Sequence, residues 1–157
     1  MTESDAREIL SWRYQAPYDF YDPDEADFER DLTTMLEPTN LYLAVSDEAD
    51  VLIGYYCYGR EAQVAGGDYS EEIWDIGGSA RPDLVGTGIG RSFIGMALNF
   101  AQAFFRAEKV RATVAAFNTR ALKACDSAGF VRTQEFKRDD GVDFIVLTKV
   151  LPPLTIE

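Results

Sequence analysis

The stretch from Trp74 to Arg91 reads Trp-Asp-Ile-Gly-Gly-Ser-Ala-Arg-Pro-Asp-Leu-Val-Gly-Thr-Gly-Ile-Gly-Arg and joins a strand-like run to a long amphipathic segment. The apolar run ends at Pro82, and Gly86, Gly88 and Gly90 then lead into the next segment. Glycine lets main-chain N–H groups crowd around a ligand because no Cβ interferes. The first turn of a helix adds free N–H donors and the positive end of its dipole. The pattern therefore predicts a cradle for an anion, most often a phosphate or pyrophosphate.

The segments around this loop show helical and strand patterns in turn. Apolar spacing predicts a short capped helix near residue 5, a helix that starts at an Asp22 cap and ends before Pro38, and helices at 89–107 and 119–128. Alternating or continuous apolar runs predict strands at 41–46, 51–58, 73–80, 110–116, 130–137 and 142–150. No repeat or linker interrupts the chain. We therefore expect one α/β domain over residues 1–157, built on a single mixed sheet.

Composition excludes several classes of function. The chain has 157 residues, of which 46% are hydrophobic, and its apolar runs are too short to predict a membrane span. The acidic N-terminus lacks the features of a secretory signal, so we expect a cytoplasmic protein. The absence of histidine excludes Ser-His-Asp and Cys-His catalysis and His-Glu-x-x-His zinc sites. Two cysteines are too few for a structural zinc site, and we expect both as reduced thiols and no bound metal.

The net charge of −12 is spread unevenly along the chain. Residues 1–80 hold 4 basic and 19 acidic residues, whereas residues 81–132 hold 8 basic and 3 acidic ones. The glycine loop thus lies in the only basic third, which favours an anionic ligand there and cations near the N-terminal half. Solubility is an alternative reason for the excess of acid. No sustained basic surface exists elsewhere, so we expect no nucleic acid as a partner.

Two familiar nucleotide motifs do not fit. The dinucleotide fingerprint needs a third glycine where Arg91 stands, and a phosphate loop of the Walker type needs Gly-Lys-Ser/Thr. The order of a strand, Arg-Pro-x-x-x-Gly-x-Gly-x-Gly, an amphipathic helix, a strand, Asn118-x-x-Ala121 and Gly129-Phe130 instead resembles the GNAT acetyltransferase superfamily. The resemblance covers roughly residues 70–150, and the two motifs are specific mainly in combination. The N-terminal aromatic stretch and the loop Gln63-Val-Ala-Gly-Gly-Asp-Tyr69 also resemble one bacterial branch of this superfamily, whose substrates are poorly defined.

The resemblance implies a splayed, mostly antiparallel sheet with helices on both faces, and acetyl-CoA as cosubstrate. The strands at 73–80 and 110–116 would part, with the pantetheine arm between them and the pyrophosphate on the glycine loop. The residues implied to bind the cofactor are Ile76, Gly78, Ser79, Ala80, Arg81, Val85, Gly86, Thr87, Gly88, Ile89, Gly90, Arg91, Asn118 and Ala121. Val85 departs from the Arg or Gln that usually opens this loop in the family.

Two residues are candidates for the chemistry. Asp75 matches a strand carboxylate that many relatives use as a base, and alternation places it opposite Trp74 and Ile76, toward the cleft. A solvated or ion-paired Asp75 is the alternative. Cys125 stands seven residues after Asn118, where the family commonly has a tyrosine that protonates the departing thiolate. Its alternatives are a small buried core residue and an oxidation-sensitive thiol.

The expected function is direct acetyl transfer from acetyl-CoA to a primary amine, without a metal or a covalent intermediate. The acidic, aromatic N-terminal half favours a cationic small molecule or peptide as acceptor. An acetyl-CoA-binding sensor with little or no turnover is the alternative. Homodimer formation is left open, and a membrane is not an expected partner.

Overall fold

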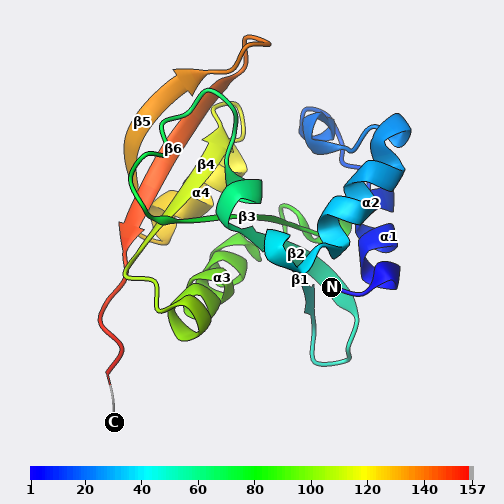
Figure 1. Ribbon diagram of the computed structural model, residues 1–157, viewed down its shortest axis with the longest axis horizontal. Helices are drawn as coiled ribbons and strands as arrows, with labels where there is room; N and C mark the ends of the chain where they lie inside the picture. The colour runs from blue at the N-terminus through cyan, green and yellow to red at the C-terminus, as the bar shows by residue number, and fades with distance from the viewer. Residues whose placement is uncertain (156–157) are drawn as a thin grey trace.

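Six strands form one open mixed sheet in the order β1-β2-β3-β4-β6-β5 (Figure 1). The structure is a computed structural model and describes residues 1–155. All neighbouring strands are antiparallel except β3 and β4, which run parallel. The predicted mixed, mostly antiparallel sheet is therefore confirmed. The strands are β1 (Tyr42–Ser46), β2 (Leu52–Tyr58), β3 (Trp74–Ala80), β4 (Lys109–Ala115), β5 (Val131–Lys137) and β6 (Asp143–Val150).

Four α-helices cover the two faces of this sheet: α1 (Glu3–Ser11), α2 (Phe28–Leu36), α3 (Gly90–Phe105) and α4 (Thr119–Ser127). Two adjacent residues of β2 show which helices cover which face, because successive side chains of a strand point to opposite faces. Tyr56 packs in the core beneath α3 and α4, whereas Tyr55 packs against the cluster that contains α1 and α2. Figure 1 shows α3 separated from α1 and α2 in the same way. Within residues 1–155 no helix is both long and apolar enough to cross a membrane.

The pairing of β3 with β4 is short and decides the shape of the site. Only Trp74 with Val110, Asp75 with Arg111, and Ile76 with Ala112 face one another across the two strands. Beyond Ile76 the strand β3 continues to Ala80 beside β2, and β4 continues to Ala115 beside β6. The sheet therefore opens between the carboxyl ends of β3 and β4, which is the predicted splay.

Gly78 lies on the β3 side of this opening, where no side chain fits. A Cβ at this position would lie 2.2 Å from the main-chain oxygen of Tyr55, and the φ angle of Gly78 is +151°. Both values require glycine. Glycine at this position thus allows β3 to stay close to β2 along the part of β3 that is no longer paired with β4.

The start of α2 differs from the prediction. Asp22 does not cap a helix; its Oδ1 accepts the main-chain N–H of Tyr14 at 3.0 Å. Asp24 caps a separate 3-10 turn at Glu25–Asp27, and the α-helix begins only at Phe28. Four acidic side chains follow one another closely here, and several of them can cap a turn. The sequence pattern therefore located the helix but not its first residue.

We expect Gly78→Ala to lower the free energy of unfolding by about 2–4 kcal/mol, because its Cβ overlaps the Tyr55 carbonyl and its backbone is strained. Gly95→Ala is the matched control, since Gly95 lies within α3 with open space around its Cβ position. That change should raise stability by about 0.5–1 kcal/mol. Urea unfolding followed by circular dichroism measures both, and equal stability of Gly78→Ala and the wild type would contradict the close approach.

Candidate active site

Main-chain groups line the β3 side of the opening. The main-chain N–H of Arg81 donates to the carbonyl of Ile53 at 2.8 Å. This bond identifies which residues of β3 direct their main-chain groups toward β2. Because pairing groups alternate along an antiparallel ladder, Ser79 also turns its polar main-chain groups toward β2. Gly78 and Ala80 turn theirs the opposite way, into the opening that β4 has left. These two residues can therefore offer N–H and C=O groups to an extended ligand.

The glycine loop leads from β3 to the N-terminus of α3. The first hydrogen bond of α3 runs from the N–H of Phe93 to the carbonyl of Ile89 at 2.9 Å. The N–H groups of Gly90, Arg91 and Ser92 precede it and have no partner within the helix. Among the described residues no side chain caps this end. The loop therefore presents the free N–H donors and positive dipole end that an anion requires.

Arg120 adds a positive charge beside this loop. A Cβ at Gly86 would lie 3.3 Å from the guanidinium carbon of Arg120, so the side chain reaches from α4 to the loop. Its guanidinium carbon also lies 4.9 Å from the ring centre of Tyr18. This contact between a cation and an aromatic face fixes the arginine without neutralising it. The guanidinium can therefore meet an anionic group held by the loop.

A cavity of about 750 Å³ joins the loop to the opening in the sheet. Most of the predicted cofactor residues line it: Ile76, Gly78, Ser79, Ala80, Val85, Gly86, Gly88, Ile89, Gly90, Asn118 and Ala121. Arg81, Thr87 and Arg91 are not among the described residues that line it. Arg81 is already paired with Asp83 at 2.6 Å and donates to the Leu52 carbonyl at 2.8 Å, so it holds the start of the loop.

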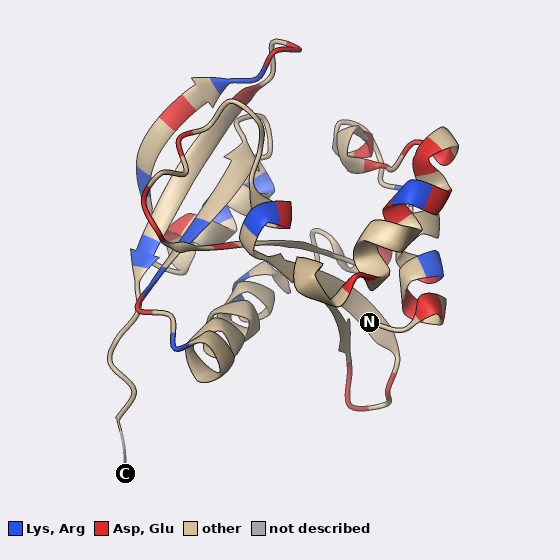
Figure 2. Cartoon of the chain, in the orientation of Figure 1, with Lys and Arg blue, Asp and Glu red and all other residues tan. Residues whose placement is uncertain are grey.

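The other end of the cavity is aromatic and acidic. Its walls include Trp12, Tyr42, Tyr55, Asp31 and Glu61. Figure 2 shows acidic residues gathered on α1, α2 and the segment that joins them. Burial raises the pKa of Tyr42, so its hydroxyl stays protonated and donates to Glu61 at 3.3 Å. This end combines negative charge with π faces, both of which attract a cation.

Two tyrosines of the segment between α1 and α2 contact opposite arms of the opening. The hydroxyl of Tyr14 donates to the carbonyl of Ala80 at 2.9 Å on β3 and lies 2.8 Å from Ser79 Oγ. The hydroxyl of Tyr21 accepts from Asn118 Nδ2 at 3.2 Å, just beyond β4. Burial raises the pKa of both phenols. No local sequence pattern predicts these contacts, because they join residues that are 66 and 97 positions apart.

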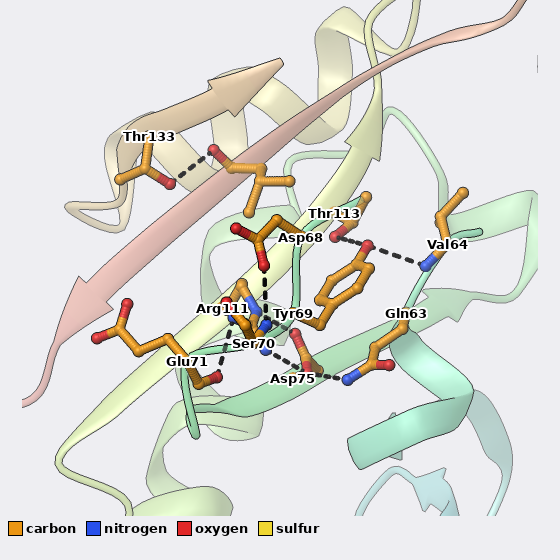
Figure 3. A network of polar contacts seen from close by, with 11 residues as sticks. Gln63, Val64, Asp68, Tyr69, Ser70, Glu71, Asp75, Arg111, Thr113 and Thr133 are labelled. Carbon is orange, nitrogen blue, oxygen red and sulfur yellow. Dashed lines mark hydrogen bonds and ion pairs between the residues drawn. The ribbon is translucent and has the colours of Figure 1, made fainter. Parts of the chain in front are cut away.

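Asp75 is ion-paired, which is the alternative that the sequence left open, and it is not among the described residues that line the cavity. Its side chain pairs with Arg111, through Nε to Oδ1 at 2.6 Å and Nη2 to Oδ2 at 2.9 Å (Figure 3). Gln63 donates to Oδ2 at 2.9 Å, and Asp75 and Arg111 are only 2% and 4% exposed. Alternation identified the correct face of β3. Arg111, which covers this face, lies 36 residues further along the chain on β4. Both carboxylate oxygens of Asp75 therefore already accept hydrogen bonds, and neither is free to act as a base.

The comparisons with known proteins agree with this geometry. A family model described as an acetyltransferase (GNAT) domain matches residues 1–131. The chain belongs to the GNAT acetyltransferase family. A comparison with curated protein sequences finds no match.

Solved structures of this family share the fold over nearly the whole chain. A spermidine N-acetyltransferase SpeG chimera from Vibrio cholerae and hSSAT has a TM-score of 0.70 at 19% identity, covering 96% of this chain and 92% of that one. Aminoglycoside acetyltransferase AAC(6')-Ib in complex with coenzyme A gives 0.74 at 17% identity, covering 96% and 91%. A GNAT-family acetyltransferase from Bacillus anthracis gives 0.73 at 14% identity, again covering 96% and 91%.

Cys125 lies on α4 with its side chain at the border between cavity and core. It lines the cavity, yet it is only 5% exposed and belongs to the apolar cluster beneath α3 and α4. Burial raises the pKa of its thiol to about 11, so the thiol stays protonated at neutral pH. Cys57 is likewise buried, and both cysteines are free thiols. Among the described residues no cluster of acidic or thiol side chains could hold a metal ion.

We expect Asp75→Asn to lower the free energy of unfolding by about 3–5 kcal/mol, because the guanidinium of Arg111 then loses its buried counter-charge. The double variant Asp75→Leu/Arg111→Met should recover most of that loss, because it buries no charge. Asp126→Asn is the control, since its pair with Arg132 is exposed and its loss should cost at most about 1 kcal/mol. A stable Asp75→Asn protein without turnover would instead identify Asp75 as a base.

Proposed function

We propose that this chain transfers an acetyl group from acetyl-CoA directly to a primary amine of a cationic small molecule or peptide. The observation that carries the proposal is the single cavity that connects free N–H groups at the start of α3 with an acidic, aromatic chamber. A diphosphate suits the first end, and an ammonium group suits the second. The opening between β3 and β4 lies between them.

The residues present fit the cosubstrate. Gly88 has a φ of +89° and open space at its Cβ position, so the loop leaves room for a phosphate. The N–H groups at the start of α3 and the guanidinium of Arg120 would hold the diphosphate. The main-chain groups of Gly78 and Ala80 would pair with the amides of the pantetheine arm, and Asn118 would bind the same arm. Two of these groups, the Ala80 carbonyl and the Asn118 amide, bond to tyrosine hydroxyls, so a ligand that pairs with them would take the place of those hydroxyls.

Acetyl-CoA supplies an activated thioester carbonyl when bound. The N–H donors of β3 at the opening can polarise such a carbonyl, because they point away from β2 and their orientation is fixed before reaction. The aromatic walls exclude water and limit hydrolysis. The remaining task of the chain is to hold a neutral amine against that carbonyl and to move two protons.

The acceptor chamber favours an amine that carries a second positive charge. Glu61 contributes a carboxylate to its wall, and Asp31 contributes a second one, whose Oδ1 also pairs with Arg30 at 3.2 Å. Trp12 and Tyr55 contribute aromatic faces. A second ammonium group held by these carboxylates would orient the first toward the opening in the sheet. Spermidine and aminoglycoside acetyltransferases are among the proteins of the same fold, and their acceptors are such polycations. We therefore place a polyamine-like or aminosugar-like acceptor ahead of a simple monoamine.

We expect Gly88→Glu to weaken the binding of coenzyme A by at least about 100-fold, because it inserts bulk and negative charge where the diphosphate would sit. Gly141→Glu is the matched control: it adds the same charge at a φ of +88° in the open β5–β6 turn, far from the loop in sequence. Isothermal titration calorimetry with coenzyme A measures both. Equal affinity of the Gly88→Glu protein and the wild type would contradict the loop as the diphosphate site.

We expect Glu61→Gln to raise KM for a diamine or polyamine by roughly tenfold, because one carboxylate facing the distal ammonium is lost. The KM for a monoamine of the same length should change little. Glu48→Gln, in the exposed turn between β1 and β2, removes one acidic charge away from the cavity and serves as control. Release of the free thiol from acetyl-CoA measures turnover. Identical KM changes for diamine and monoamine would contradict a second subsite.

The same thiol-release assay, run with a panel of amines, tests the function itself. Release that depends on a cationic amine supports acetyl transfer. Tight binding of coenzyme A without release on any amine would favour the sensor alternative, in which the cavity reports acetyl-CoA without turnover.

A further inference from the structure

Two hydroxyl groups meet at the point where the sheet opens. Thr113 is the first residue of β4 after the last pair with β3, and its side chain lines the cavity. Its Oγ1 lies 2.9 Å from the hydroxyl oxygen of Tyr69, which comes from the long connection between β2 and β3 (Figure 3). Neither residue was a candidate in the sequence analysis.

The hydrogen bonds around Tyr69 indicate which of the two hydroxyl groups is the donor. The main-chain N–H of Val64 donates to the Tyr69 hydroxyl oxygen at 2.9 Å. Among the described residues, the only acceptor within reach of the Tyr69 hydrogen is Thr113 Oγ1. Either hydroxyl can donate to the other, but the Val64 N–H already occupies one lone pair of the Tyr69 oxygen, so we take Tyr69 as the donor and the Thr113 hydrogen as free. Because Thr113 is among the residues that line the cavity, its hydroxyl can then donate to a group in the opening.

The surroundings of Tyr69 hold both its ring and its hydroxyl in place. The guanidinium carbon of Arg111 lies 4.8 Å from the centre of the Tyr69 ring. Asp75 fixes Arg111 in that position, and Arg111 also donates to the Glu71 carbonyl at 3.2 Å. The Val64 N–H adds a hydrogen bond to the oxygen itself. Tyr69 is thus held at its ring face by Arg111 and at its hydroxyl oxygen by Val64, with its hydroxyl beside Thr113.

We propose that Thr113 donates the proton that the leaving sulfur requires in acetyl transfer, and that Tyr69 orients Thr113 and replaces its proton. This inference rests on the proposed acetyl transfer. The amine nitrogen forms a bond to the acetyl carbon, and the bond from that carbon to sulfur breaks. The sulfur takes the proton of Thr113, Thr113 takes that of Tyr69, and the proton lost by the amine returns to Tyr69 through solvent. No net proton is gained or lost.

The position of Cys125 explains why another donor is needed. Its thiol is packed beneath α3 and α4, on the face of the sheet opposite to Thr113. Thr113 shares its face with Arg111, because alternate residues of a strand point the same way. That face also carries the acidic chamber, as the lining residues from α1 and α2 show. The Thr113 hydroxyl is therefore on the side from which an amine would approach.

Five variants are compared with the wild type. We expect Thr113→Val to lower kcat by about 100-fold, whereas Thr113→Ser, which keeps the hydroxyl, should stay within about threefold of the wild type. Tyr69→Phe should lower kcat by about tenfold, and combining it with Thr113→Val should add no further loss, because both act in one relay. Thr133→Val is the matched control: its hydroxyl donates to the Val146 carbonyl on β6 at 3.3 Å and does not line the cavity.

A second measurement does not depend on turnover. The thiol of bound coenzyme A can be titrated by the ultraviolet absorbance of its thiolate. A donor hydroxyl favours the charged form, so Thr113→Val should raise the pKa of the bound thiol by about one unit. Tyr69→Phe should raise it less, and Thr133→Val should leave it unchanged. The affinity for coenzyme A, measured by calorimetry, should change by less than about threefold in all variants.

Two results would overturn the inference. One is a Thr113→Val protein that keeps both its kcat and the pKa of the bound thiol. The other is a larger loss of kcat in Cys125→Ala than in Thr113→Val, which would make the thiol the donor. If the wild type binds coenzyme A but acetylates no amine, the proposed function fails. The thiol titration then still decides whether Thr113 contacts the sulfur.

Discussion

The early parting of β3 from β4 is the constraint on which the rest of the molecule depends. Their parallel pairing ends at Ile76 and Ala112, and Asp75 and Arg111 close it with a buried ion pair. Beyond these residues β3 stays paired with β2 on its other edge, and β4 stays paired with β6. The main-chain groups that the two strands would have exchanged therefore have no strand partner. The gap that remains has polar main-chain groups on its walls.

Charge is divided across this gap in the same way as along the chain. The glycine loop and Arg120 lie at one end of the cavity, and the carboxylates of Asp31 and Glu61 lie at the other. In the proposed function, an anionic cosubstrate and a cationic acceptor would each be attracted to their own end. The sheet opening is where the two ends meet, so complementary charge would bring the reacting groups to one place.

Local patterns predicted the elements well and their distant contacts poorly. Period-2 and helical spacing placed every strand and three helices close to their observed bounds, because these signals depend on near neighbours. The glycine loop was found for the same reason. Asp75 was assigned the correct face, but the sequence could not decide between a base and an ion pair, since Arg111 reaches it from another strand. Tyr69 and Thr113 carry no motif at all, and only the folded connection between β2 and β3 brings them together.

The walls of the opening have a consequence for how such proteins diverge. A surface of peptide N–H and C=O groups presents the same chemistry whatever side chains stand behind it. Gly78 strengthens this effect, because no side chain can project there. Proteins that share only 14–19% of their residues with this chain can therefore retain the same split sheet. Substitutions behind the main-chain walls therefore leave the chemistry of the opening unchanged. Substitutions among the aromatic and acidic residues of the chamber change its shape and charge.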